Sequence, residues 1–448
     1  MVDLRYLLLA VGCLGAACAG GRGGAGGGAR PTAVAPADVP ALRAQAAQHP
    51  SDAQIRFRLA AALVAAGRCD TGVVVARAGQ TLAPAVAAAP LIIGACQEKD
   101  GRPDLAFSTY TDFAAQHPKA RGVAAVRGKA LLALRAQAEQ TARLALARES
   151  TLTALPPEAS TLAVLPLTIA GDSSFRPLSR GLAELLTTDL ALVRSLRLLE
   201  RVQIGALLDE LKLGQTQRAD ASTAARVGRL LRAERMVQGV ARITADGPVN
   251  LSASVVRGDG TVRSGAQANG TFRQLLDLEK QLVFGLASQL GILLTEAERQ
   301  RILQQGPKNL AAFLAYSEGL EALDRGDYQA AARAFGAAAQ ADPSFQAAQD
   351  QQQAAQAAPT VEGGDIASVL QEAQEPPPPP PSAPPITSAS EGVLGAGTAD
   401  LNPTIADQLG ATTGGATTEQ KTTTQSQGIN GLTGVSVTIR IIFKRPTL

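Results

Sequence analysis

The sequence predicts a multidomain α+β protein in which α-helical hairpins flank a compact α/β domain. A Pro/Thr-rich tail, expected to be disordered, ends in one β-strand. Three observations predict this class: proline and glycine recur every 34 residues near the start, short apolar strands alternate with amphipathic helices in the middle, and the composition then collapses into Gln, Ala, Pro, Thr and Gly. The expected segments are an N-terminal signal (1–17), a glycine-rich tether (18–39), helical repeats (40–150), the α/β domain (158–305), one more helix pair (308–350), a low-complexity linker (352–432) and the strand (433–448).

The composition excludes several classes of function. Lys and Arg number 42 against 39 Asp and Glu, and a net charge of +3 is too balanced for a general nucleic-acid binder. Aromatic residues make up 3% and there are two histidines, which disfavours a stacking platform for bases or sugars and a His-rich metal site. We therefore expect no nucleic-acid partner, no metal and no cofactor.

The first residues have the pattern of an export signal. Arg5 precedes the apolar run 6–11, which is shorter than the roughly 20 residues that cross a membrane. Small residues follow and end in Cys18, and the stretch 14–18 (LGAAC) resembles a bacterial lipobox, in which cleavage leaves a lipid-modified cysteine. The resemblance implies lipidation of Cys18. Cys13 is a competing site, and an ordinary secretory signal with two incidental cysteines is the other alternative.

The residue after Cys18 bears on the membrane. It is Ala19, whereas an Asp there would indicate inner-membrane retention in the enterobacterial pattern. The resemblance therefore implies a lipid anchor in the outer membrane, with the chain on its periplasmic face in the outer-membrane-bounded periplasmic space. Each buried methylene of such an anchor contributes about 0.8 kcal/mol.

A repeat begins near residue 40. Its prolines lie 34 residues apart, and its glycines share that period, which is the period of tetratricopeptide (TPR) helix pairs. Glycine ends the first helix of each pair, and proline follows the second. The expected pairs are 53–66 with 69–82, 86–99 with 103–116, and a degenerate third pair over 120–148 that turns at Arg135. The repeat positions singled out here are Gly67, Pro84, Gly94, Gly101 and Pro118.

TPR arrays imply peptide or protein binding, and a spacer without a ligand is the alternative. Within the array, Cys69 begins one helix and Cys96 lies near the end of the next, antiparallel helix, so the two thiols should lie opposite each other. Export favours oxidation, and we expect a disulfide between them. Two buried thiols that behave as small apolar side chains are the alternative.

Residues 158–305 read as alternating strands and helices. Strands are expected at 161–167, 196–199, 236–243, 249–256 and 261–269, with the third and fourth antiparallel, and helices at 178–193, 202–212, 222–232 and 273–291. A capping box, Thr295 to Glu298, should open a last helix.

Several blocks of this domain, in order, resemble the CsgG-like family of bacterial envelope lipoproteins, which includes the curli secretion component. The resemblance implies no catalytic activity, and it implies roles in secretion, envelope assembly or partner activation. The blocks are 162–166 (LAVLP), 181–190 (GLAELLTTDL), 198–201 (LLER), 210–215 (ELKLGQ), 224–231 (AARVGRLL) and 237–239 (VQG).

The sequence disfavours a secretion channel. A membrane-spanning strand needs about 9–11 residues. The connection at Arg194-Ser195 and the turn at Gly258 are both short, so no long hairpin is inserted.

Few residues of this domain are candidates for a catalytic role. A Ser nucleophile would need a base, but His49 and His117 lie outside the domain, each before a repeat proline. Glu200 and Arg201 are expected to cap or pair near the next helix. We expect no enzyme and no catalytic residue. The polar residues considered are Asp172, Ser173, Glu184, Asp189 and Glu200.

A second repeat-like segment and the tail complete the chain. Residues 308–350 resemble one TPR unit, whose helix pair should pack on the neighbouring domain or on a partner chain because a lone pair cannot bury its face. Near the end, 435–443 alternates apolar and polar residues as a strand does. We expect that strand to add to the chain's own sheet, while pairing with a partner or forming part of an oligomer are alternatives. The TPR positions of this segment are Gly319, Gly326, Tyr328 and Pro343.

Taken together, the sequence predicts a non-enzymatic outer-membrane lipoprotein that faces the periplasm. It is expected to bind envelope proteins or peptides through its TPR and CsgG-like surfaces, in envelope assembly or secretion. A homo-oligomer is a further possibility. The alternatives are a subunit of an oligomeric curli-type secretion channel and a periplasmic activator of a cell-wall synthase.

Overall fold

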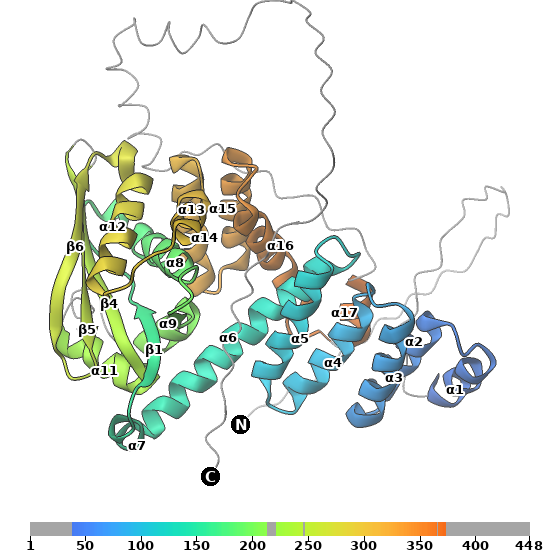
Figure 1. Cartoon of the computed structure of the whole chain (residues 1–448). Helices are drawn as coiled ribbons and strands as arrows, with labels where there is room; N and C mark the ends of the chain where they lie inside the picture. The colour runs from blue at the N-terminus through green and yellow to red at the C-terminus, as the bar shows by residue number, and fades with distance from the viewer. Residues whose placement is uncertain (1–37, 213–220, 245–246, 365, 373–448) are drawn as a thin grey trace, which may run out of the picture. The chain divides into compact units, whose positions relative to one another are not determined.

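The computed structural model of the chain describes residues 38–212, 221–244, 247–364 and 366–372 (Figure 1). These residues form helices and one six-stranded sheet, as the predicted α+β class requires. The expected signal, Cys13, Cys18 and the C-terminal strand lie outside them. Among the described helices, none combines the length and the apolar character that crossing a membrane requires.

Helical hairpins fill the first part of the described chain. Gly67 and Gly101 end the first helix of two hairpins with φ of +76° and +69°, a left-handed conformation that glycine adopts without a Cβ clash. Pro84 and Pro118 lie in the connections that follow the second helices. The helices are α1 (Val39–Gln48), α2 (Ala53–Ala65), α3 (Cys69–Leu82), α4 (Ala88–Lys99) and α5 (Pro103–Gln116).

The small residue of the repeat has a packing role. A Cβ on Gly94 of α4 would lie 2.2 Å from the ring of Tyr110 in α5, so only glycine admits that ring. Gly319 has the same relation to Phe335, whose ring would lie 2.5 Å from an added Cβ. These two close approaches fix how the helices of each hairpin pack together.

The prediction of a third hairpin over 120–148 is wrong. Those residues contain one 25-residue helix, α6 (Val123–Ala147), and Arg135 lies in its middle. Between 129 and 147 there is neither glycine nor proline, and Ala and Leu predominate, so nothing in that stretch ends a helix. The helix that packs beside α6 comes instead from α16 (Gln346–Val361), more than 200 residues later. The two helices approach closely at Gly128, where an added Cβ would lie 3.0 Å from Ala357.

The prediction of a low-complexity linker from residue 352 is also wrong for residues up to 372, which include two helical segments. Helix α16 continues to Val361, and α17 (Ile366–Glu372) follows it. The alanines of α16 are buried between its neighbours: Ala357 and Ala358 lie at Gly128 of α6, and Ala355 packs with α14 and α15, because small side chains allow helices to approach closely. An ion pair of 3.0 Å between Arg127 and Asp350 joins α6 and α16. The buried alanines are Ala348, Ala354, Ala355, Ala357 and Ala358.

A further hairpin precedes α16. It consists of α14 (Leu310–Asp324) and α15 (Tyr328–Ala341), and Gly326 makes its turn with φ of +75°. Helix α14 packs on α8 (Leu178–Leu190) of the α/β domain, so the expectation that this pair packs on its neighbour is confirmed. At Gly181 of α8 an added Cβ would lie 1.9 Å from the Ser317 hydroxyl. The contact between α8 and α14 is therefore as close as the contacts inside the hairpins.

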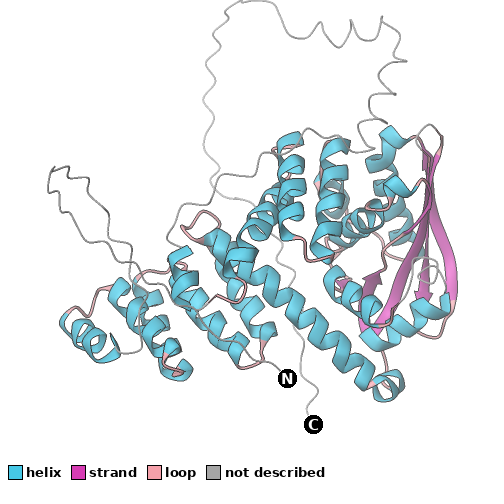
Figure 2. Cartoon of the chain, turned by 180° about the vertical axis from the view of Figure 1, so that it is seen from behind, coloured by secondary structure: helices cyan, strands magenta, loops and turns pink. Residues whose placement is uncertain are grey.

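One sheet forms the centre of the α/β domain (Figure 2). Its order is β3-β1-β4-β5-β6, with β2 also paired to β4. Strands β4 and β5 pair antiparallel, as predicted, while β1 runs parallel to both β3 and β4. The sequence did not predict β2. The strands are β1 (Glu158–Val164), β2 (Thr168–Gly171), β3 (Arg197–Leu198), β4 (Ala233–Ile243), β5 (Val249–Arg257) and β6 (Val262–Gly270).

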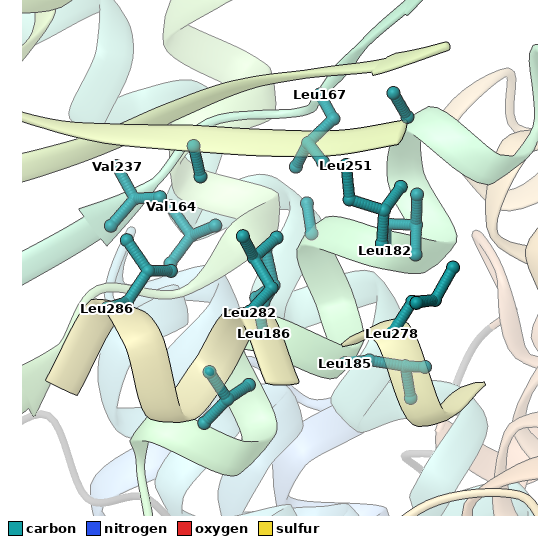
Figure 3. Close-up of a cluster of buried hydrophobic side chains, with 14 of the residues drawn as sticks. Val164, Leu167, Leu182, Leu185, Leu186, Val237, Leu251, Leu278, Leu282 and Leu286 are labelled. Carbon is teal, nitrogen blue, oxygen red and sulfur yellow. The ribbon is translucent and has the colours of Figure 1, made fainter. Parts of the chain in front are cut away.

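Helices cover both faces of the sheet. Leu162 and Val164 of β1 belong to one cluster with leucines of α8 and α12. Figure 3 shows Val164 among the leucines of these two helices. The neighbouring Ala163 and Leu165 point to the opposite face and pack with α9 and α11, as the alternation of a strand requires. The remaining elements are α7 (Glu149–Ala154), η2 (Ser173–Phe175), α9 (Arg201–Glu210), α11 (Ala221–Leu231), η3 (Phe272–Gln274), α12 (Leu275–Gln289) and α13 (Glu296–Gln304), which the predicted capping box of Thr295 and Glu298 opens.

The structure links Cys69 of α3 to Cys96 of α4, with their Cα atoms 5.5 Å apart. We predict that this bridge forms in the exported protein. It should stabilise the fold by roughly 3 kcal/mol, because it lowers the conformational entropy of the unfolded chain. Alkylation of denatured, unreduced protein should leave both thiols unmodified, and prior reduction should expose them. Full alkylation of Cys69 and Cys96 without reductant would contradict the prediction.

Candidate functional site

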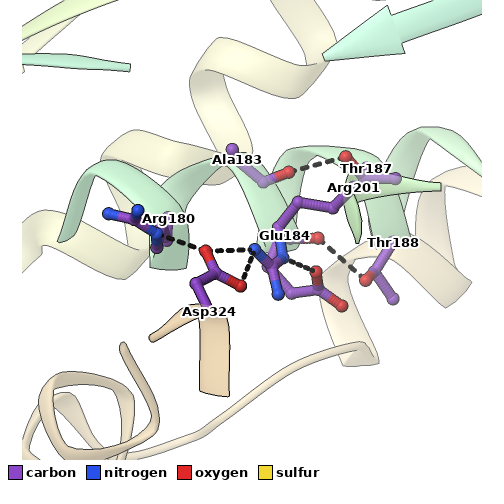
Figure 4. Close-up of polar contacts among 7 residues, drawn as sticks. All are labelled: Arg180, Ala183, Glu184, Thr187, Thr188, Arg201 and Asp324. Atoms are coloured by element: carbon purple, nitrogen blue, oxygen red, sulfur yellow. Dashed lines mark hydrogen bonds and ion pairs between the residues drawn. The ribbon is translucent and has the colours of Figure 1, made fainter. Parts of the chain in front are cut away.

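The α/β domain and the later hairpin meet at a buried group of charges (Figure 4). Arg201, the first residue of α9, is 5% exposed. Its Nε donates to Glu184 Oε2 of α8 at 3.0 Å, and its Nη1 donates to both carboxylate oxygens of Asp324 at 3.0 Å. Arg180 of α8 pairs with the same Asp324. We call Arg180, Glu184, Arg201 and Asp324 the junction cluster, because it joins α8 and α9 to the last residue of α14.

Burial and charge act against each other in this cluster. Burial disfavours the charged form of Asp324, but Arg201 and Arg180 outweigh it and hold the pKa of that carboxyl below its ordinary value. Within the described part of the chain, the Glu200 side chain forms no ion pair or hydrogen bond of this kind. Burial and the charge of Glu184 raise the pKa of Glu200 to about 7. Glu200 occupies the N-cap position of α9, yet its side chain makes no capping bond, whereas the expected pairing of Arg201 is confirmed.

A cavity of about 460 Å³ lies beside the junction cluster. One wall is α6, the second is α9, and the third is the turn from α14 to α15. Arg201 and Asp324 reach its lining, so the buried ion pairs form part of its floor. The side chains that project from the two long walls include Leu131, Arg135, Glu139, Val202 and Ala206.

A second cavity of about 830 Å³ continues along α6. It is bounded by the turn between α4 and α5, by Gly326 and by the connection 362–363. Both cavities share Arg135, Glu139, Arg143 and Tyr328, so they form one continuous depression, which we call the α6 groove. Each of the two cavities by itself falls within the roughly 300–1,000 Å³ of sites that hold small ligands.

The α6 groove carries mixed charge on an apolar base. Arg135 and Glu139 form an exposed pair of 3.1 Å within α6. In the second cavity, Lys129 Nζ lies 3.1 Å from Glu98 Oε2, and the Tyr110 hydroxyl donates to the other oxygen of Glu98 at 3.0 Å. The exposed Arg135–Glu139 pair contributes little to stability, whereas the Lys129 side chain is only 10% exposed. Arg135 and Glu139 are therefore available to exchange partners with a polar ligand.

A segment of the chain itself covers the face next to the groove. Helix α17 packs on α2 and α4, through Ile366, Val369 and Leu370. Its neighbours there include Phe57 and Ile92. The helical hairpins therefore already hold a short apolar helix on this face.

The structure brings some of the predicted positions to the groove and leaves others as turns. Gly326 and Tyr328 line it, and Gly101 borders the second cavity. Gly67, Pro84, Pro118 and Pro343 lie in connections outside it. The TPR identity of these positions stays a prediction. Cys18 lies outside the described residues.

Of the polar residues considered for chemistry, Glu184 and Glu200 lie near each other at the junction cluster, and Asp172 and Asp189 lie elsewhere. Asp172 accepts a hydrogen bond from the Ser174 amide at the start of η2, on the surface. Asp189 is buried beside Lys280, and burial raises the pKa of Asp189 to about 6. Within the described ranges, no group of three or more His, Cys, Asp or Glu side chains is arranged to hold a metal ion. The absence of an enzymatic activity stays a prediction.

Sequence reasoning missed Arg180, Asp324 and the groove residues of α6. Arg201 and Asp324 are 123 positions apart, and Arg180 and Asp324 are 144 apart, so no local spacing relates them. The one available signal was the position of Asp324 two residues before the predicted turn glycine, Gly326, which places it at a helix end.

Comparison with known proteins identifies one family. Residues 143–246 match the model of the family described as curli production assembly/transport component CsgG. This segment, less than a quarter of the 448 residues, runs from the end of α6 through β4 and includes α8 and α9, so it is CsgG-like. It contains Arg201 but neither Asp324 nor Tyr328. No curated protein matches the chain.

Proposed function

We propose that the chain is a non-enzymatic lipoprotein of the outer membrane, on its periplasmic face, that binds other envelope proteins in assembly or secretion. The observation that carries the proposal is the CsgG-like segment 143–246. The family description names curli production assembly and transport, and the resemblance to CsgG-like lipoproteins implies a location at the cell envelope. The lipobox-like sequence at Cys18 supports the same location.

The α6 groove is the binding surface we assign to this function. One of its walls, α9, belongs to the CsgG-like segment, and another, the start of α15 at Tyr328, belongs to the later hairpin. A ligand in the groove would contact both, which suits a protein that couples helical repeats to the α/β domain. Because α17 already packs as a short apolar helix on the adjacent face, we propose a helical peptide with apolar and charged sides as the ligand.

Photocrosslinking from the groove in intact cells tests this proposal. A photoreactive amino acid in place of Ala136, which is exposed and lines the second cavity, should crosslink to a discrete envelope protein. The matched control is Leu144, which is 49% exposed on the same helix but lines neither cavity, and it should give at most background crosslinking. Equal yields from both positions would contradict binding in the groove.

A second candidate is a subunit of an oligomeric transport assembly. The word transport in the family description favours it. Under this alternative the purified protein would form closed rings in detergent and conduct ions in a planar bilayer. A monomer without conductance would leave the binding function as the better account.

A further inference from the structure

Strand β6 forms one edge of the sheet. Among the described strands it pairs with β5 alone, and Figure 1 shows it at the outer margin of the domain. Figure 2 shows the same margin from behind, again with no described strand beyond it. Such an edge presents a row of backbone N–H and C=O groups on its outer side.

The edge has few of the devices that prevent unwanted pairing. Proteins block long edges with Lys, Pro, bulges or short strands. Strand β6 is nine residues long and contains neither Lys nor Pro, and its only charged residue is Arg263. One irregularity interrupts its pairing with β5, and 266–270 are regular beyond it. Val262 is 49% exposed, which is high for a valine in a strand. An edge of this length and composition is suited to accept another strand.

We propose that the chain's own segment 435–443 pairs with the outer edge of β6. This segment lies outside the described residues and, like β6, is nine residues long. Its apolar residues would continue the face on which Ala266 and Ala268 pack against α12. Its polar residues would continue the face that carries the exposed Gln267 and Asn269. The apolar set is Val435, Val437, Ile439, Ile441 and Phe443, and the other face carries Ser436, Thr438 and Arg440 with the single apolar residue Ile442.

The covalent connection makes the chain's own strand the occupant. Residues 373–434 separate it from the end of α17, and a connection of that length reaches up to about 200 Å when extended. That exceeds any distance within a folded chain of this size. A tethered strand also reaches an effective concentration on the order of millimolar, above that of a second copy in solution. Backbone pairing along the edge would supply affinity, and the alternating side chains would set the register.

Crosslinking of the full-length protein in detergent tests the pairing. A photoreactive amino acid in place of Gln267 should crosslink to the 435–443 peptide, in a product that migrates as one chain. The positional control is Arg242, which is exposed on β4 but lies between β2 and β5, and it should not crosslink to that peptide. Peptide mapping by mass spectrometry identifies the site.

Two proline variants complete the test. Ile439→Pro removes a backbone donor from the strand and should lower the Gln267 crosslink about tenfold or more. Val393→Pro, in the segment before it, should leave the yield within about twofold, since it does not alter the strand. Crosslinks that join Gln267 to 435–443 of a second chain would overturn pairing within the chain. Absence of the crosslink, or equal yields from the two proline variants, would overturn the proposal altogether.

Discussion

Replacing Arg201 by alanine is expected to lower the free energy of unfolding by about 3–5 kcal/mol. Arg201 is 5% exposed, and it holds Glu184 and Asp324 by three hydrogen bonds of 3.0 Å. Without it, the side chains of Glu184 and Asp324, which are 28% and 20% exposed, keep one guanidinium, that of Arg180, near Asp324 alone. Such uncompensated burial is far costlier than the loss of an exposed pair.

Arg325→Ala is the matched control for this prediction. Arg325 is adjacent to Asp324 in the sequence, but its side chain is 58% exposed and its 3.5 Å pair with Glu321 lies on the surface of α14. Its removal should change stability by no more than about 0.5 kcal/mol. Urea unfolding followed by circular dichroism measures both variants. A loss for Arg201→Ala no larger than that for Arg325→Ala would mean that the junction cluster does not hold the two parts together.

The effect of Arg201→Ala is expected to shrink as the pH falls. In the wild-type protein the lowered pKa of Asp324 contributes stability that is present above its unfolded value and is lost in acid. In the variant the contribution of Arg201 is gone, so the pKa of Asp324 should rise. Glu200, already raised to about 7, should rise further because Arg201 lowers it. Protonation of these carboxylates removes the uncompensated negative charge in the variant. The difference in unfolding free energy between the wild-type protein and Arg201→Ala should therefore be smaller near about pH 5 than near about pH 8.

Much of the fold could be predicted where local rules decide it. Turns at Gly67, Gly101 and Gly326 need a left-handed backbone, and glycine at those positions marks them in the sequence. The antiparallel pair β4 and β5 followed from two apolar runs across a short turn. The capping box at Thr295 followed from its spacing alone.

The parts that were missed depend on contacts between distant segments. A period of 34 residues favoured a hairpin over 120–148, but the composition of that stretch favours one long helix, and α16 supplies its neighbour. Alanines such as Ala357 and Ala358 look like low complexity in isolation, and they become a packing surface only when α6 lies beside them. Strand β2 is four residues long, too short to show alternation.

The sequence predicted single features of the candidate site, but not that they lie together. The pairing of Arg201 was expected near its own helix, yet two of its hydrogen bonds go to Asp324, 123 residues away. Tyr328 was recognised as a repeat position, and its place on the wall of the α6 groove depends on α6 and α9 together. Charged residues on a long helix such as Arg135 and Arg143 look like an ordinary solvated face until the surrounding walls are known.

Replacing Cys18 by serine is expected to release the protein from membranes completely. The thiol of Cys18 is the predicted attachment point of the lipid, and serine offers no sulfur for that modification. Each acyl methylene contributes about 0.8 kcal/mol, so an anchor of several chains is effectively permanent and its loss is all-or-none. Fractionation of cells on a density gradient measures the distribution, and the variant should appear in the soluble fraction.

Cys13→Ser is the control, because Cys13 is the competing site five residues earlier. It should leave the protein in the membrane fraction. If the Cys13→Ser variant leaves the membrane fraction and the Cys18→Ser variant stays in it, the lipidated residue is Cys13. Retention of both single variants and of the double variant would show that lipid at these cysteines does not hold the chain.

The most direct test of the central claim is the mass of the N-terminal peptide of the wild-type protein, taken from purified outer membranes. We expect a chain that begins at Cys18 and carries acyl groups. Recovery of the unprocessed chain, with Met1 in place and no acyl group, as a free species in the cytosol would contradict the whole account.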